Sequence, residues 1–313
     1  MINEFKCSQV GGANTGIDDC SLQIGKIVGF FLVWPSFTLT AANLLNDGAL
    51  KTAMLAAASA DIPSQRIYPV HMLEDITDNS AEPQQQTFGY GTAVDTDNGT
   101  YDWTFPFLKG GLCLLKALQM FNKSSIRVIF YDAEGTLFGQ KVGDTLKGIP
   151  LNQFVANKWT PATGTTVMGT SVKFNFQPKY INEQIGFYKV TDFSFEDIEG
   201  LRNASLSLAA AQASPVFKFK VLAGCQKLDL FDLYEDELAD ENLWEFFNAD
   251  TGASVGITSV AADTGLKAFT VTLVAADILA ATRITGKLAA PSVLTAAGLT
   301  HLDSVTFTFT KVA

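Results

Sequence analysis

Hydrophobic and polar residues alternate over much of the chain, a pattern typical of β-strands that bury one face. The longest apolar run, KIVGFFLVW at 26–34, predicts a strand that is covered on both faces and ends at Pro35. Residues 66–76 look extended, with Pro69 at an edge position. Further strands are predicted at 87–95, 100–107, 126–131, 170–177, 187–195 and 203–208.

Two segments follow a helical period instead. The segment AANLLNDGALKTAMLAAASA predicts a helix near 41–60, which Thr40 caps and Gly48 breaks or kinks. A second helix is predicted near 110–121, because Leu112, Leu115 and Leu118 recur on one face.

Two turn signals connect the predicted strands. DAEG at 132–135 predicts a hairpin from 126–131 into TLFGQKV. DTDNG at 95–99 predicts a hairpin turn between 87–95 and 100–107. The same residues resemble the start of a calcium-binding loop. Position 12 of such a loop would be Pro106 instead of Glu, so we interpret the segment as a turn.

The chain divides into three parts by pattern. Residues 1–25 predict a flexible N-terminal arm, since GGANTG offers few apolar anchors. Residues 26–212 predict a β-rich assembly domain, a sandwich or barrel with one or two helices. The run of mostly small residues AAAQAS before Pro215 predicts a linker near 210–215. Five alternating segments then predict an immunoglobulin-like β-sandwich at 213–313. The fold class is therefore mainly β (α+β).

Composition narrows the function. The 313 residues carry 22 Lys+Arg against 32 Asp+Glu, a net charge of −10, which argues against binding nucleic acid through its phosphates. Hydrophobic residues make up 47% and charged residues only 17%. Such a chain buries a large core, and its low charge suggests a surface covered by copies of itself. No signal peptide or membrane span is evident, so we expect synthesis in the cytoplasm.

Candidate catalytic chemistry is scarce. The two histidines, His71 and His301, are far apart in sequence, and no G-x-S-x-G, H-E-x-x-H or phosphate-loop motif occurs. His71 between Val70 and Met72 is expected to be a packed or edge residue. The four cysteines lack C-x-x-C spacing, so we expect mostly buried, reduced thiols, with a Cys7–Cys20 disulfide as the alternative. We predict no catalytic residue, no cofactor and no metal site.

Acidic residues cluster at 229–241, where leucines interleave with them. We interpret this segment as amphipathic, with a solvated acidic face that could also face a partner or a lumen. No His or Cys joins the cluster, which makes it a poor metal site. The candidate acidic outer face comprises Asp229, Asp232, Glu235, Asp236, Glu237, Asp240 and Glu241.

Several strings resemble virion structural proteins of tailed phages and prophages of the Bacteroidetes type. They are TDNS with AEP, TFGYGT, YDWTFPFLKGGLCLLKAL, RVIFYDAEGTLFG, GIPL and PKYINE, within residues 62–200. The layout, a β-rich domain with an appended sandwich and an acidic balance, also resembles tail tube proteins of long-tailed phages. That resemblance implies a twisted sheet flanked by a helix, assembled head-to-tail into stacked rings. It carries over no functional residue.

The hypothesis is a structural, self-assembling virion protein, most specifically a tail tube subunit, and not an enzyme. A negative lumen would let DNA pass without sticking. If the sandwich is external, the lumen must use N-terminal acids, with Asp132, Glu134 and Asp144 as candidates. The expected partners are other copies of the chain, six-fold rings being one option, and other virion proteins, with no membrane. The alternatives are a head or neck component (capsid, decoration or ring protein) and a surface or carbohydrate-binding module that uses Trp244.

Overall fold

The computed structural model describes residues 25–87, 89, 93–107, 111–164, 169–210 and 213–311. The predicted arm at 1–25 therefore lies outside the described residues, apart from Gly25. The chain forms two compact units. The first comprises residues 25–58 and 62–199, and the second comprises residues 59–61 and 200–311.

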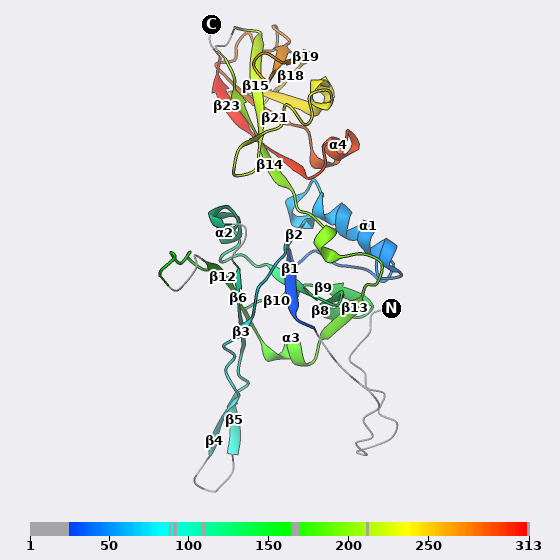
Figure 1. Ribbon diagram of the computed structural model, residues 1–313, viewed down its shortest axis with the longest axis vertical. Coiled ribbons are helices and arrows are strands. Elements are labelled where there is room, and N and C mark those ends of the chain that lie inside the picture. The colour runs from blue at the N-terminus through cyan, green and yellow to red at the C-terminus, as the bar shows by residue number, and fades with distance from the viewer. Residues whose placement is uncertain are drawn as a thin grey trace. The chain divides into compact units, whose positions relative to one another are not determined.

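The first unit is built on a seven-stranded sheet with the order β13-β8-β7-β1-β2, in which β10 also pairs with β7 and β9 with β8 (Figure 1). Its strands are β1 (Ile27–Val33), β2 (Ile67–Val70), β7 (Arg127–Asp132), β8 (Thr136–Val142), β9 (Thr145–Lys147), β10 (Ile149–Pro150) and β13 (Ile185–Lys189). The apolar run at 26–34 is thus a strand flanked by β7 and β2. Phe30 and Leu32 point into one core, whereas Phe31 and Val33 point into another. This confirms the prediction of a strand covered on both faces.

A second sheet packs over one face of the first, with the order β11-β12-β6-β3. Its strands are β3 (Thr77–Asp78), β6 (Tyr101–Phe107), β11 (Gln153–Ala156) and β12 (Thr170–Phe176). Aromatic rings fill the space between the two sheets. The Phe130 ring of β7 lies 5.4 Å from that of Phe174 and 5.7 Å from that of Phe105. Such edge-on and tilted pairs add to the gain from burial.

The opposite face of the seven-stranded sheet is covered by α1 (Asp47–Ala58), which buries Leu50, Met54 and Ala58. The predicted cap was wrong. Thr40 closes a separate turn with Asn43, and the Asn46 Oδ1 accepts the Ala49 N–H at the true helix start. The helix therefore begins at Asp47, with Gly48 in its first turn, where the glycine neither breaks nor kinks it.

The predicted second helix is α2 (Gly111–Gln119), which buries Leu115 and Leu118 against the core between the sheets. Leu112 of the predicted stripe is 53% exposed, so the apolar face is narrower than expected. A single turn, α3 (Pro178–Asn182), precedes β13.

One predicted hairpin is confirmed and the other is wrong. Strands β7 and β8 pair antiparallel through DAEG, and Gly135 takes a φ of +80° at the turn. At 95–99 there is no hairpin turn. Residues 93–97 form β5 (Ala93–Asp97), which pairs with β4 (Gln84–Thr87), and Gly99 marks an irregular point at a φ of +73° before β6. Asn98 and Gly99 thus connect β5 to β6 and do not form a hairpin turn.

The second unit is a β-sandwich of two sheets, with the orders β19-β20-β15-β14-β22 and β18-β17-β21-β23, and with β16 paired to β15. The first sheet contains β14 (Arg202–Leu208), β15 (Val216–Ala223), β16 (Leu228–Asp229), β19 (Ile257–Asp263), β20 (Ala268–Leu273) and β22 (Leu302–Val305). The second contains β17 (Trp244–Asn248), β18 (Ser254–Val255), β21 (Arg283–Leu288) and β23 (Phe307–Thr310), and α4 (Pro291–Ala296) adds one short helix. The mainly β, α+β fold class is confirmed, whereas an immunoglobulin-like topology stays a prediction.

The boundary between the units lies earlier than the predicted 212/213 division. Strand β14 pairs antiparallel with β15 from Ala204 to Leu208, so 209–215 connects two neighbouring strands of one sheet. The small residues there belong to a connection inside the sandwich. The units instead divide between Glu199 and Gly200.

Candidate functional site

Asp132, one of the predicted lumen acids, is 2% exposed and does not face solvent. Its carboxylate accepts N–H groups from Glu134 at 3.0 Å, Thr136 at 2.7 Å and Gly25 at 2.9 Å. It therefore holds the β7–β8 turn closed, because these donors would otherwise lack a partner near the core. The prediction that Asp132 faces a lumen is wrong for this reason.

Glu134 and Asp144 are both exposed. Glu134 lies in the turn before β8 and Asp144 lies in the turn after it, so the two carboxylates occupy opposite ends of that strand. A strand of seven residues is about 23 Å long at roughly 3.3 Å per residue. The two acids do not form one local cluster.

The acidic segment of the second unit is held to its core by Leu230, Phe231 and Leu238, which are all buried. Asp229 pairs with Lys220 at 3.1 Å, and Asp232 pairs with Lys267 at 2.5 Å. The remaining acids of the predicted outer face have separate positions. Asp240 accepts the Asn242 N–H at the start of a short 3₁₀ turn, Glu235 is half-buried, and Asp236, Glu237 and Glu241 are exposed. The segment is thus amphipathic, as interpreted from its sequence.

Trp244 is 3% exposed, and its indole N–H donates to the Leu238 carbonyl at 2.9 Å. The ring packs against Phe246 and Phe269 inside the sandwich. A buried indole offers no flat face to a sugar, which removes the platform on which the carbohydrate-binding alternative depended.

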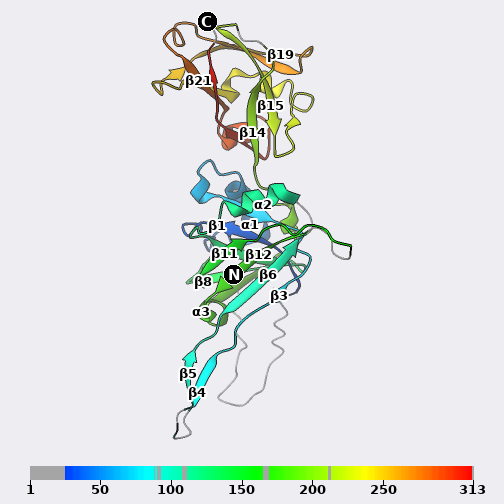
Figure 2. The same ribbon diagram turned by 90° about the vertical axis from the view of Figure 1, so that its left-hand side faces the viewer.

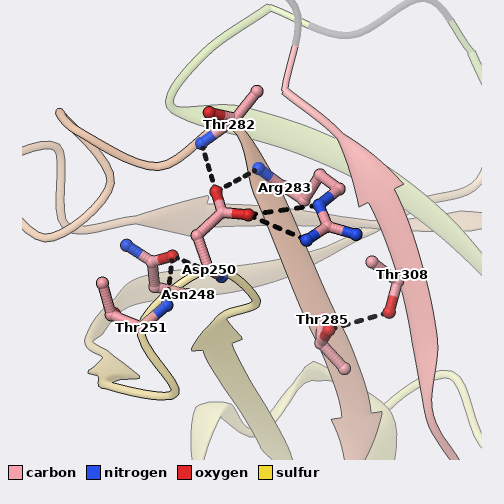
Figure 3. A network of polar contacts seen from close by, with 7 residues as sticks. All are labelled: Asn248, Asp250, Thr251, Thr282, Arg283, Thr285 and Thr308. Atoms are coloured by element: carbon pink, nitrogen blue, oxygen red, sulfur yellow. Dashed lines mark hydrogen bonds and ion pairs between the residues drawn. The ribbon is translucent and has the colours of Figure 1, made fainter.

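A polar network ties two loops of the sandwich together (Figure 3). The Asp250 carboxylate accepts the Thr282 N–H at 3.0 Å and is clamped by the Arg283 guanidinium at 3.0 and 3.1 Å. These bonds, the Thr282 N–H first, hold the pKa of Asp250 below its usual range. Asn248 closes the adjoining turn by accepting the Asp250 N–H. The network is a structural lock between β17 and β21.

His71 of the first unit bridges two buried partners. Its Nε2 lies 3.0 Å from the Ile198 carbonyl oxygen and therefore carries the proton, which leaves Nδ1 to accept the Tyr131 hydroxyl at 2.5 Å. Burial lowers the pKa of His71, and the Ile198 bond with Glu196 and Glu199 offsets part of that effect. Burial also raises the pKa of Tyr131 above its ordinary range. The expectation of a packed histidine is confirmed.

A cleft of about 860 Å³ opens in the first unit beside the edge strand β11. It is lined by residues 122–127 and 150–155 together with Pro35 and Asn175. Amide, hydroxyl and basic side chains predominate, and no Asp or Glu is present among the described residues that line it. Sequence analysis missed this cleft, although a run of Asn, Lys and Ser at 122–125 was a signal of a polar surface.

Strands β4 and β5 form a separate two-stranded ribbon, which pairs with no other sheet in the part of the chain that the structure describes. Figures 1 and 2 show it projecting from the first unit, on the side away from α2 in both views. The side chains of Gln84–Thr87 are all exposed.

Other chemistry is sparse in the described part of the chain. No group of three or more His, Cys, Asp and Glu residues there could hold a metal ion, and no helix there is long and apolar enough to cross a membrane. Cys113 and Cys225 are each disulfide-bonded, and Cys225 is exposed. The expectation of reduced, mostly buried thiols is therefore wrong for these two residues.

No family model and no curated protein matches the chain.

The role of Asp132 can be tested by substitution. Asp132→Ala removes the acceptor for three backbone N–H groups and should lower the free energy of unfolding by about 3 kcal/mol. Asp144→Ala is the matched control, because Asp144 is an exposed turn residue near the other end of β8 and should change stability by less than about 0.5 kcal/mol. Urea unfolding measures both, and equal effects would contradict the buried-acceptor role.

The pKa of His71 predicts a pH dependence of stability. Because folding lowers this pKa, the unfolded chain binds the proton more readily. The contribution of neutral His71 is complete above the ordinary value of 6.5 and is lost as the pH falls through the lower, folded pKa. The stability difference between about pH 7.5 and about pH 5 should therefore be larger in the wild type than in His71→Gln. Identical pH profiles in denaturant unfolding would exclude His71 as the cause.

Proposed function

We propose that this chain is a structural, self-assembling virion protein, most specifically a tail tube subunit that forms stacked head-to-tail rings. The observation that carries the proposal is the β4–β5 ribbon, which projects from the fold, exposes the side chains of β4 and pairs with no other strand among the described residues. A two-stranded ribbon is marginally stable by itself in water, so contact with another chain would stabilise it.

Open sheet edges support the same proposal. Strands β2 and β13 end the seven-stranded sheet, and β3 and β11 end the four-stranded sheet. An edge strand presents backbone N–H and C=O groups that can pair with another chain. Ring contacts of this kind are head-to-tail, since a self-complementary patch closes only a dimer.

Electrostatics support passage of DNA without binding. The net charge of −10 disfavours adhesion to phosphate. With Asp132 buried, the candidate lumen acids of the predicted set narrow to Glu134 and Asp144. The exposed acids of 229–241 then serve as a solubilising outer face.

Assembly is tested with the full-length protein at high concentration. Negative-stain microscopy and light scattering should detect rings that stack into tubes. Twelve-fold rings or icosahedral particles would favour the head or neck alternative over the tube, and a protein that stays monomeric would contradict self-assembly altogether.

The lumen assignment has its own test in phage particles. Reversing Glu134 and Asp144 to Lys should slow DNA ejection, because the passing phosphates would meet positive charge. The matched control reverses Asp236 and Glu237, which are exposed acids of the proposed outer face, and should leave ejection unchanged. Equal ejection rates for both double variants would contradict the assignment.

A further inference from the structure

The cleft lies along the outer side of β11, the edge strand of the four-stranded sheet, where no further strand is paired among the described residues. In an antiparallel strand, successive residues point their N–H groups alternately toward the partner strand and away from it. Asn157 N–H bonds to Ser171 of the adjoining strand, so the Ala156 N–H points away from β12. There the Asn122 side chain accepts it at 2.8 Å, and the Asn122 amide donates back to the Ala156 carbonyl at 3.4 Å. Asn122 thus imitates one residue of an additional strand.

Phe154 comes two residues before Ala156 and shares its direction. Its backbone N–H and C=O therefore also point to the open side of β11, into the cleft that Phe154 helps to line. The Phe154 side chain is buried, which anchors this stretch of edge to the core. An extended segment entering the cleft would find a rigid strand with main-chain groups already aligned.

The charge of the cleft indicates which kind of extended segment would bind there. Lys123 is exposed at the rim, and Arg127 lies on its wall with one guanidinium nitrogen bonded to Gln140 at 3.0 Å. Asn152 and Gln153 add exposed amides. A cationic, amide-rich cleft with a free strand edge suits an extended segment that is acidic and polar.

The ribbon of this same chain has that chemistry. Residues 78–97, which include the ribbon, contain four acidic residues and neither Lys nor Arg. Glu82 is exposed two residues before the three glutamines of β4, with Pro83 between them. The ribbon projects away from α2 (Figures 1 and 2). The run 122–127 that lines the cleft begins at Asn122, just after the C-terminal end of that helix. A contact between ribbon and cleft is therefore most readily made between two copies, in a head-to-tail sense.

We propose that the cleft at the β11 edge is the docking site for the β4–β5 ribbon of a second copy of this chain, with β4 adding to β11 and Glu82 and its acidic neighbours facing Lys123 and Arg127. This inference rests on the proposed function as a self-assembling protein, and it names the two surfaces that meet.

A zero-length cross-link tests the contact directly. Carbodiimide joins an amine to a carboxylate only when the two touch, so an equal mixture of ¹⁴N- and ¹⁵N-labelled full-length protein is treated and digested. Cross-linked peptides that join Lys123 of one isotope to a carboxylate of 74–97 of the other are expected. Mixed-isotope cross-links that leave Lys123 out, or Lys123 cross-links within one isotope only, would overturn the proposal.

Charge reversal gives an independent readout. Lys123→Glu should weaken self-association measured by sedimentation velocity by roughly tenfold, because an attraction becomes a repulsion. Lys26→Glu is the matched control, since Lys26 is an exposed lysine that lies outside the cleft and on no edge strand, and should leave association unchanged. The double variant Lys123→Glu with Glu82→Lys should recover association.

The outcomes separate this inference from the proposed function. If the wild type assembles and Lys123→Glu assembles equally well, the docking site is wrong while self-assembly stands. If the wild type remains monomeric at all concentrations, both fail. Circular dichroism of each variant confirms that a loss of association is not a loss of fold.

Discussion

The first unit depends on the burial of both faces of β1. Phe30 and Leu32 face the aromatic core between the two sheets, and Phe31 and Val33 face the core beneath α1. Burying one such side chain contributes about 1.5–3 kcal/mol, so four of them on adjacent positions join the layers into one unit. Gly29 on the same strand leaves room for the Tyr131 ring, which any Cβ would overlap. The Tyr131 hydroxyl in turn donates a hydrogen bond to His71.

Carboxylates that accept several hydrogen bonds organise the turns around these cores. Asp132 closes the β7–β8 turn. Asp47 joins the start of α1 to the Tyr188 hydroxyl at 2.9 Å and to the Thr191 N–H at 2.7 Å. Burial raises the pKa of Asp47, but these bonds together lower it more, and burial with the Asp47 bond raises the pKa of Tyr188 to about 12. Asp132 and Asp47 therefore stabilise the fold through their hydrogen bonds, and their charges contribute less to the exposed surface.

Local signals predicted the elements that local chemistry determines. The apolar run of β1 and the DAEG turn of β7–β8 both appear where expected, because burial and a glycine at positive φ act within a few residues. The errors arose where a local signal had two uses. Asn46 and Thr40 are both of residue types that are common at helix N-caps, and the run AAAQAS suits a domain linker as well as a connection between paired strands. The cleft could not be predicted, because Asn122 and Ala156 meet only through sheet pairing across 34 positions.

The bond between His71 and the Ile198 carbonyl has a mechanical consequence. Ile198 and Phe195 are buried in the core beneath α1, and the chain passes into the second unit directly after Glu199. Tension applied to the chain at Gly200 is therefore transmitted to a residue clamped between an imidazole and an aromatic core. Extension of this connection would require breaking that hydrogen bond and withdrawing an isoleucine from the core, so its resistance to load is set by the interior of the first unit.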